Sequence, residues 1–276
     1  MGIVLGLAAA LLYGSADFAG GLLSRRLPSL SVAVVGTIAS TAIAWLAVAA
    51  MGAAPSFGSV VWGSVAGLGG GVGTIALYRG LARGQMSVVG PVSAVGSAIL
   101  PVLVGIGAGE RPSLVAAAGL VIALPAIGLV SAGGSGPDVA LRTSLIDGLH
   151  AGVSFGLMFV GLARAGDHAG LWPVASEQTV SLAVLSVLAL RSRPVLRLGL
   201  RALGLPVVIG VASMAATLCY FAASHAGLLA TVAVVTSLYP GVTVALAGML
   251  LHERFSAPQR TGLGMCALAI VAIALN

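Results

Sequence analysis

The chain has 276 residues, of which 59% are hydrophobic and only 7% are charged, whereas about 25% of the residues in an average soluble domain are charged. Charged side chains this sparse cannot cover the surface of a soluble protein, and the high hydrophobic content also excludes an intrinsically disordered chain. The formal net charge is +6. Every positive charge is an arginine, and nearly all of them fall between apolar runs, which argues against a nucleic-acid-binding surface. The composition therefore indicates a polytopic protein embedded in a lipid bilayer.

Ten apolar runs are separated by charged or turn-forming residues, and each run is close to the length needed to cross a bilayer as a helix. The predicted helices cover residues 2–23, 30–51, 59–78, 85–108, 113–132, 145–163, 171–190, 203–223, 228–251 and 257–275. Each run is continuously apolar, whereas the strands of a membrane barrel are short and alternate. The sequence therefore predicts an all-α integral membrane protein with ten transmembrane helices.

Charged pairs mark two of the predicted helix ends. Glu110-Arg111 follows the fourth helix and Glu253-Arg254 follows the ninth, and we interpret both pairs as structural caps at the membrane interface. Between them, residues 133–138 read Gly-Gly-Ser-Gly-Pro-Asp, which is typical of a flexible connection. We expect a linker over residues 133–144, which separates a first half, residues 1–132, from a second half, residues 145–276.

The arginines also predict orientation, because cytoplasmic loops carry an excess of positive charge. Loops after odd-numbered helices hold eleven of the thirteen arginines, at positions 25, 26, 79, 83, 142, 191, 193, 197, 201, 254 and 260. The other two, Arg111 and Arg164, follow even-numbered helices. This count favours both termini outside the cytoplasm.

The two halves show an internal repeat. A shift of 143 residues aligns Thr74 with Thr217 and brings the Glu-Arg caps of the two halves into register, and a shift of 146 aligns glycines at the two starts. Since each half has an odd number of helices, the second copy must insert upside down. The sequence thus predicts two inverted five-helix repeats, an arrangement typical of secondary transporters.

Several motifs carry a family resemblance. They are Tyr13-Gly14-Ser15, the stretch Gly-Gln-Met-Ser-Val-Val-Gly-Pro at 84–91, Gly109-Glu110-Arg111, Ser237-Leu238-Tyr239-Pro240, and Leu-His-Glu-Arg-Phe-Ser at 251–256. With these motifs the chain resembles the EamA family of the drug/metabolite transporter superfamily over essentially its whole length. It departs from the family in having Tyr13-Gly14 where Trp-Gly is usual.

The resemblance implies a secondary transporter in the inner membrane of a prokaryotic cell. It would export amino acids, their metabolites or other small amphipathic solutes by alternating access. The resemblance also implies that both termini lie in the cytoplasm, which is the opposite of the arginine count, so the orientation stays open.

Two acids lie well inside apolar runs. Asp17 is in the first predicted helix and Glu177 in the seventh, and an acid within hydrocarbon costs at least about 2.5–3.5 kcal/mol. Such a group faces the bundle interior or a wet cavity. Our hypothesis is that one or both bind and release protons during transport. The alternative is a structural hydrogen bond or ion pair, with Arg25, Arg26 or Arg164 as possible partners.

We expect a central cavity lined by the first, third, fourth, sixth, eighth and ninth predicted helices. Prolines inside helices mark broken backbone, which is tolerated where it faces protein or a cavity. Aromatic walls suit an amphipathic or cationic solute. The candidate cavity residues are Tyr13, Asp17, Thr74, Tyr78, Pro91, Glu177, Thr217, Tyr220, Tyr239 and Pro240.

Enzymatic chemistry has little support in the sequence. The histidines have no metal-ligand spacing, the glycine-rich stretch 67–73 lacks the lysine of a phosphate-binding loop, and the two cysteines indicate no disulfide framework. We therefore expect no metal, no cofactor and no enzyme, and either a monomer or a homodimer. The alternatives to a transporter are a passive channel, an accessory membrane subunit, and, with less support, a lipid-modifying membrane enzyme.

Overall fold

The computed structural model describes residues 1–83, 86–107, 113–132, 138–166, 170–192, 202–226, 232, 235–236, 238–251 and 256–274. Over these residues the protein is all-α. The caps predicted at Glu110, Arg111, Glu253 and Arg254 lie outside the described residues, as do residues 133–137 of the predicted linker. The rest of that linker, residues 138–144, is helical and was wrongly predicted as a connection.

The described helices are, in chain order, α1 Gly2–Leu23, α2 Ser29–Met51, α3 Phe57–Arg83, α4 Met86–Gly107, α5 Leu114–Ala132, α6 Asp138–Arg164, α7 Trp172–Ser192, α8 Gly204–Ala226, α10 Tyr239–Leu250 and α11 Ala257–Ala274. Six of them, α1, α2, α3, α6, α7 and α8, are long and apolar enough to cross a membrane within their described residues. Together with the composition, these helices indicate an integral membrane protein in contact with lipid.

Two boundaries differ from the prediction by more than a turn. The third helix continues five residues beyond 78 to Arg83, and the sixth begins at Asp138 and not at 145. The added stretches are where charged residues interrupt the apolar run: Arg79 and Arg83 in the third helix, and Asp138 and Arg142 in the sixth. Backbone hydrogen bonding does not require apolar side chains, so a helix continues past the end of its apolar run into the interface.

The helix predicted over 228–251 is interrupted at Leu238, so a single continuous helix was wrong for this segment. Leu238 lies in a turn, and the described part of the segment continues as α10 from Tyr239. Two short-range bonds mark the turn: Leu238 N donates to Val235 O at 3.3 Å, and Gly241 N donates to Leu238 O at 2.8 Å. The cause is Pro240, which has no N–H and is favoured in the first turn of a helix.

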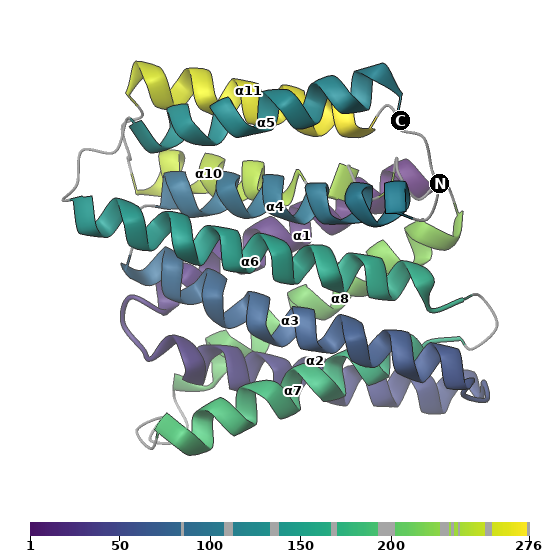
Figure 1. Ribbon diagram of the computed structural model, residues 1–276. Coiled ribbons are helices and arrows are strands. Elements are labelled where there is room, and N and C mark those ends of the chain that lie inside the picture. The colour runs from purple at the N-terminus through teal and green to yellow at the C-terminus, as the bar shows by residue number, and fades with distance from the viewer. Residues whose placement is uncertain are drawn as a thin grey trace.

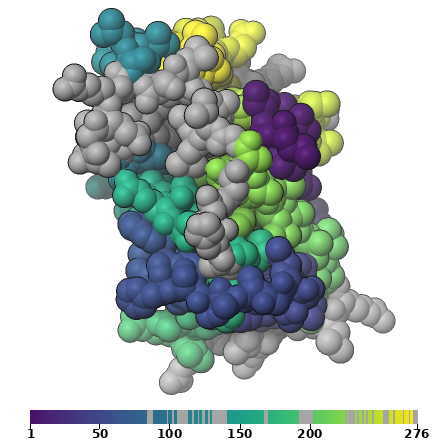
Figure 2. Space-filling model, turned by 90° about the vertical axis from the view of Figure 1, so that its right-hand side faces the viewer, coloured from purple at the N-terminus to yellow at the C-terminus, as the bar shows by residue number. Residues whose placement is uncertain are grey.

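The helices pack side by side as a bundle (Figure 1). In that view α5 and α11 form a pair along one edge and α2 and α7 lie along the opposite edge, with the remaining helices between them. The pairs in contact include α3 with α6 and α7, α4 with α6, α1 with α8 and α10, and α2 with α7 and α8. Figure 2 shows the end of α8 against the first turn of α1 on one face of the molecule. These central pairs enclose the site described next.

Candidate functional site

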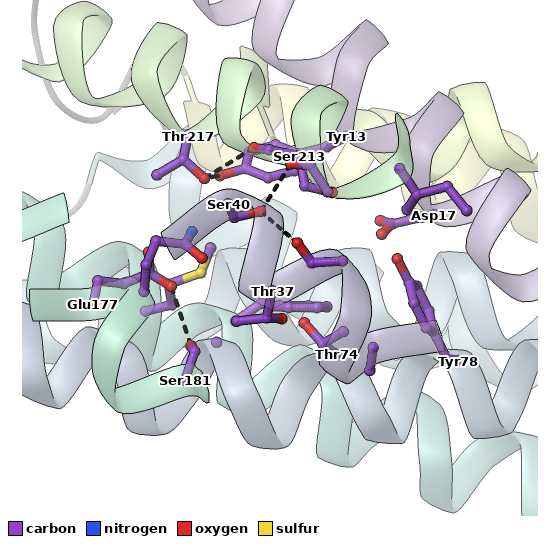
Figure 3. Close-up of a pocket in the computed structure, with 18 of the residues that line it drawn as sticks. Tyr13, Asp17, Thr37, Ser40, Thr74, Tyr78, Glu177, Ser181, Ser213 and Thr217 are labelled. Atoms are coloured by element: carbon purple, nitrogen blue, oxygen red, sulfur yellow. Dashed lines mark hydrogen bonds between the residues drawn. The ribbon is translucent and has the colours of Figure 1, made fainter. Parts of the chain in front are cut away.

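A narrow cavity lies between the central helices (Figure 3). Its described lining comes from α1, α2, α3, α6, α7, α8 and α10. The cavity offers about 70 Å³ to the centres of water-sized molecules. One water needs roughly 10–15 Å³ by that measure, so there is room for a few waters or for a solute with a few heavy atoms.

Most of the residues selected from the sequence come together in this cavity. Those that line it are Tyr13, Asp17, Thr74, Tyr78, Glu177, Thr217 and Tyr239. Three others are not among the described lining residues. Pro91 is buried within α4, Tyr220 is buried with its hydroxyl 3.4 Å from the carbonyl oxygen of Phe159, and Pro240 is in the first turn of α10.

The contribution of α2 was missed by sequence reasoning. It lines the cavity with Val32, Ala33, Gly36, Thr37 and Ser40. A signal was present, because glycine and hydroxyl residues recur at helical spacing from position 36 to position 41. This stretch of α2 contains no charge, aromatic ring or proline. Small residues of this kind are equally typical of plain helix packing, so they did not distinguish a cavity wall. In contrast, α4 supplies no lining residue within the described part of the chain.

Glu177 is deeply buried, with only 3% of its surface exposed. Its Oε1 lies 3.3 Å from the hydroxyl of Ser181, and its Oε2 has no hydrogen-bond partner among the described residues. The Ser181 hydroxyl also lies 2.9 Å from the carbonyl oxygen of Gly67 on α3. Gln178, the next residue on α7, is buried as well and also lines the cavity.

Asp17 is partly exposed and lies beside Tyr78 in Figure 3, away from Glu177. No hydrogen bond or ion pair joins Asp17 to another residue within the described ranges. An ion pair that the structure describes lies elsewhere: Arg79 of α3 binds the buried Asp147 of α6 at 2.5 Å. The arginine partners considered for the two cavity acids are therefore not seen, and Arg164 instead lies 6.0 Å from the ring centroid of Trp62.

Aromatic rings and hydroxyls form another part of the wall. The hydroxyl of Tyr13 is 2.7 Å from Oγ1 of Thr217, which in turn donates to a carbonyl of its own helix. Tyr239 makes edge contacts with the rings of Tyr13 and Phe155, with centroids 6.2 and 6.3 Å apart. Its hydroxyl is held 3.1 Å from Oγ of Ser93 on α4. These contacts fix the rings and orient them around the cavity.

Two contacts beside the cavity have the same form. Ser40 of α2 donates to the carbonyl oxygen of Gly210 on α8 at 2.8 Å, and Ser181 of α7 donates to that of Gly67 on α3 at 2.9 Å. The serines are 141 residues apart and the glycines 143. At both places a glycine lets two helices approach closely enough for backbone atoms to touch.

Of these two corresponding helix contacts, only the one between α3 and α7 carries a carboxylate, that of Glu177. The Gly210 Cα position faces the backbone of Gly36, and the Gly67 Cα position faces the backbone of Glu177. Glu177 thus occupies on α7 the place that Gly36 occupies on α2. The cavity is similar on its two sides in backbone packing and in serine hydroxyls, but different in charge.

The described residues contain no group of three or more histidine, cysteine, aspartate or glutamate side chains that could hold a metal ion. The lining itself offers two carboxylates, hydroxyls, one amide and aromatic rings. Such an arrangement can bind a small polar or charged solute and exchange protons.

No family model matches the chain, and no curated protein matches it. A solved structure described only as "Crystal structure of protein" superposes with a TM-score of 0.68 over 99% of this chain and 94% of its own, at 16% sequence identity. At that identity the match shows that the whole fold is shared, and nothing about function.

Proposed function

We propose that the protein is a secondary transporter of small metabolites, such as amino acids or related amphipathic solutes, that works by alternating access. The observation that carries this proposal is a cavity between the two halves of an apolar bundle, lined by hydroxyl groups and by two acids without an arginine partner among the described residues. An acid costs about 2.5–3.5 kcal/mol or more in hydrocarbon. A protein that needed only to pack has no reason to place two of them there.

Ten membrane-spanning helices in two inverted repeats form the framework of this proposal. Helix contacts support it, because they recur when each helix is exchanged for its counterpart in the other half. α1 contacts α8 as α6 contacts α3, α2 contacts α8 as α7 contacts α3, and α1 contacts α10 as α6 contacts α4. The paired bonds of Ser40 and Ser181 support it at the level of single atoms. The resemblance to the EamA family, and with it an inner-membrane exporter, belongs to the same proposal.

Alternating access follows naturally from such a framework. When the two halves exchange conformations, the cavity opens first to one side of the membrane and then to the other. Glycine contacts such as Gly36 with Gly210 hold helices together through backbone and van der Waals packing. Such contacts can shift without exposing a charge to lipid, and the substrate stays near the bilayer midplane.

Asp17 and Glu177 are the groups that could couple transport to protons. Each lies in the cavity wall, and neither has an ion-pair partner among the described residues. A carboxyl group that faces alternate sides of a membrane can take up a proton on one side and release it on the other. Asp17→Asn and Glu177→Gln retain size and hydrogen bonding but remove this capacity.

The test is counterflow in proteoliposomes that contain the purified protein. Vesicles loaded with unlabelled amino acids or amines should accelerate uptake of the same labelled solute severalfold, since a carrier is trans-stimulated by its own substrate. A passive channel would show uptake without trans-stimulation, and an accessory subunit would show no uptake; either result would refute the proposal.

A second measurement tests proton coupling. A pH gradient should drive accumulation by the wild type, and this drive should be lost in Asp17→Asn, in Glu177→Gln or in both. Asp147→Asn is the control, because Asp147 is an acid about as buried as Glu177 that does not line the cavity. Unchanged rate and unchanged response to the gradient in both cavity variants would eliminate coupling through these acids.

A further inference from the structure

The charge of the cavity wall selects the charge of its solute. Both ionisable acids of the wall, Asp17 and Glu177, contribute negative charge when ionised, and no arginine or histidine is among the described lining residues. In a medium of low dielectric constant, an unpaired charge interacts strongly with a bound solute. A carboxylate solute would be repelled, and a solute with a positive group would be attracted.

The hydrogen bonding of Glu177 selects the kind of positive group. The Ser181 hydroxyl has one proton, which is shared between the carbonyl of Gly67 at 2.9 Å and Glu177 Oε1 at 3.3 Å. Glu177 Oε2 has no described donor at all, although the side chain is 3% exposed. A buried carboxylate oxygen without a donor is costly, and an N–H group of a solute would satisfy it, whereas methyl groups on nitrogen would not.

The aromatic wall and the volume select the rest of the solute. Tyr239 contacts the rings of Tyr13 and Phe155 edge to face, and all three rings line the cavity. Ring faces attract a cation within about 6 Å and also pack against methylene groups. With about 70 Å³ available to the centres of water-sized molecules, the cavity fits a short chain and not a bulky ring system.

We infer that the substrate is a small primary amine in its ammonium form. The ammonium group donates to Glu177, and the hydrocarbon chain lies against the rings of Tyr13, Phe155 and Tyr239. Asp17, on the other side of the cavity, adds to the negative potential that attracts the cation (Figure 3). This inference rests on the proposed function and names the substrate class of the same site.

Calorimetric titration of the purified protein in detergent tests the substrate class without requiring transport. The probes are butylamine, tetramethylammonium, alanine and butyrate, all near neutral pH, where butylamine is an ammonium ion. Butylamine should bind at least tenfold more tightly than each of the others. This comparison uses the wild type alone and so does not depend on how any variant folds.

Variants then assign the binding to Glu177. Glu177→Gln should weaken butylamine binding at least tenfold, Glu177→Asp should weaken it less, and Asp147→Asn should leave it within twofold of the wild type. Each variant is first shown to be monodisperse on size exclusion. Equal binding by folded Glu177→Gln, tighter binding of alanine, tetramethylammonium or butyrate, or no binding of any probe would each overturn the inference.

Counterflow with the same probes separates this inference from the proposed function. Counterflow of alanine without binding of butylamine would retain the transporter and overturn the amine. Butylamine binding that depends on Glu177, without counterflow of any solute, would support the amine and refute the transporter.

Discussion

A single methyl group at Gly210 should separate two helices of the cavity wall. Gly210 of α8 lies directly against Gly36 of α2, and a Cβ at Gly210 would be 2.7 Å from the Gly36 carbonyl carbon and 2.8 Å from its Cα. Carbon atoms prefer separations of about 3.5–4.0 Å. Because the obstructing atoms are backbone, no side chain can rotate away, and Gly210→Ala must push α8 from α2 by about 1 Å.

The loss of stability in Gly210→Ala has two causes. Overpacking of a closely packed site costs about 1–3 kcal/mol. The displacement also stretches the Ser40 bond to the Gly210 carbonyl beyond its present 2.8 Å, and a bond between membrane helices contributes about 0.6 kcal/mol on average. The preference of a helix for alanine over glycine offsets about 0.5–1 kcal/mol of this, so we expect Gly210→Ala to lower the free energy of unfolding by about 1–3 kcal/mol. Gly67→Ala should cost a similar amount, because its Cβ would lie 2.7 Å from Cβ of Val180 and 3.1 Å from the carbonyl carbon of Glu177.

Gly264→Ala in α11 is the matched control. It makes the same chemical change in a helix, but its Cβ would have nothing within 4 Å. Alanine is favoured over glycine in a helix by about 0.5–1 kcal/mol, so this variant should be unchanged or slightly stabilised. Unfolding of each protein in mixed micelles with increasing sodium dodecyl sulfate, followed by circular dichroism, gives the three free energies. Equal stability of Gly210→Ala and Gly264→Ala would refute the reasoning.

Two further pairs of substitutions test other contacts. Arg79→Ala leaves Asp147, which is 3% exposed, without the arginine that binds it. This variant should be destabilised by about 3 kcal/mol or more in the same unfolding assay. Asp147→Asn should be destabilised less, because Arg79 is 43% exposed and can reach water or headgroups. Equal costs for the two would contradict this account. Tyr13→Phe removes the 2.7 Å bond to Thr217 and should lower the free energy of unfolding by about 0.5–1.5 kcal/mol. Thr217→Val should lower it by the same amount, and the double variant by little more. Additive losses would show that the two side chains do not act as a pair.

The helices themselves could be predicted from the sequence. Apolar runs of bilayer length, separated by arginines and turn residues, predicted an all-α membrane protein, and the described helices lie close to the predicted ranges. Hydropathy is a local property that does not depend on which helix packs against which. The end of α3 and the start of α6 were less accurate, because backbone hydrogen bonding continues beyond the apolar run.

Charged and aromatic residues inside apolar runs also predicted part of the cavity lining. Asp17 and Glu177 stood out because a charge inside an apolar run is expensive, and both line the cavity. Tyr13 and Tyr239 were selected for their aromatic rings and line it too. Tyr220 was selected on the same grounds but is turned away, toward the backbone of Phe159. A spacing pattern identifies the face of a helix, but not the neighbour that the face meets.

Tertiary structure alone decided which helices form the wall. α2 lines the cavity with glycine, threonine and serine, residue types that also mark ordinary close packing between membrane helices. The bond from Ser40 to Gly210 spans 170 positions, and that from Ser181 to Gly67 spans 114. Only the packed bundle shows that these bonds correspond, and that Glu177 stands where the other side has Gly36. The sequence by itself determined where the chain crosses the apolar phase, because that depends on each segment alone. The site depends on contacts between segments, which no single segment encodes.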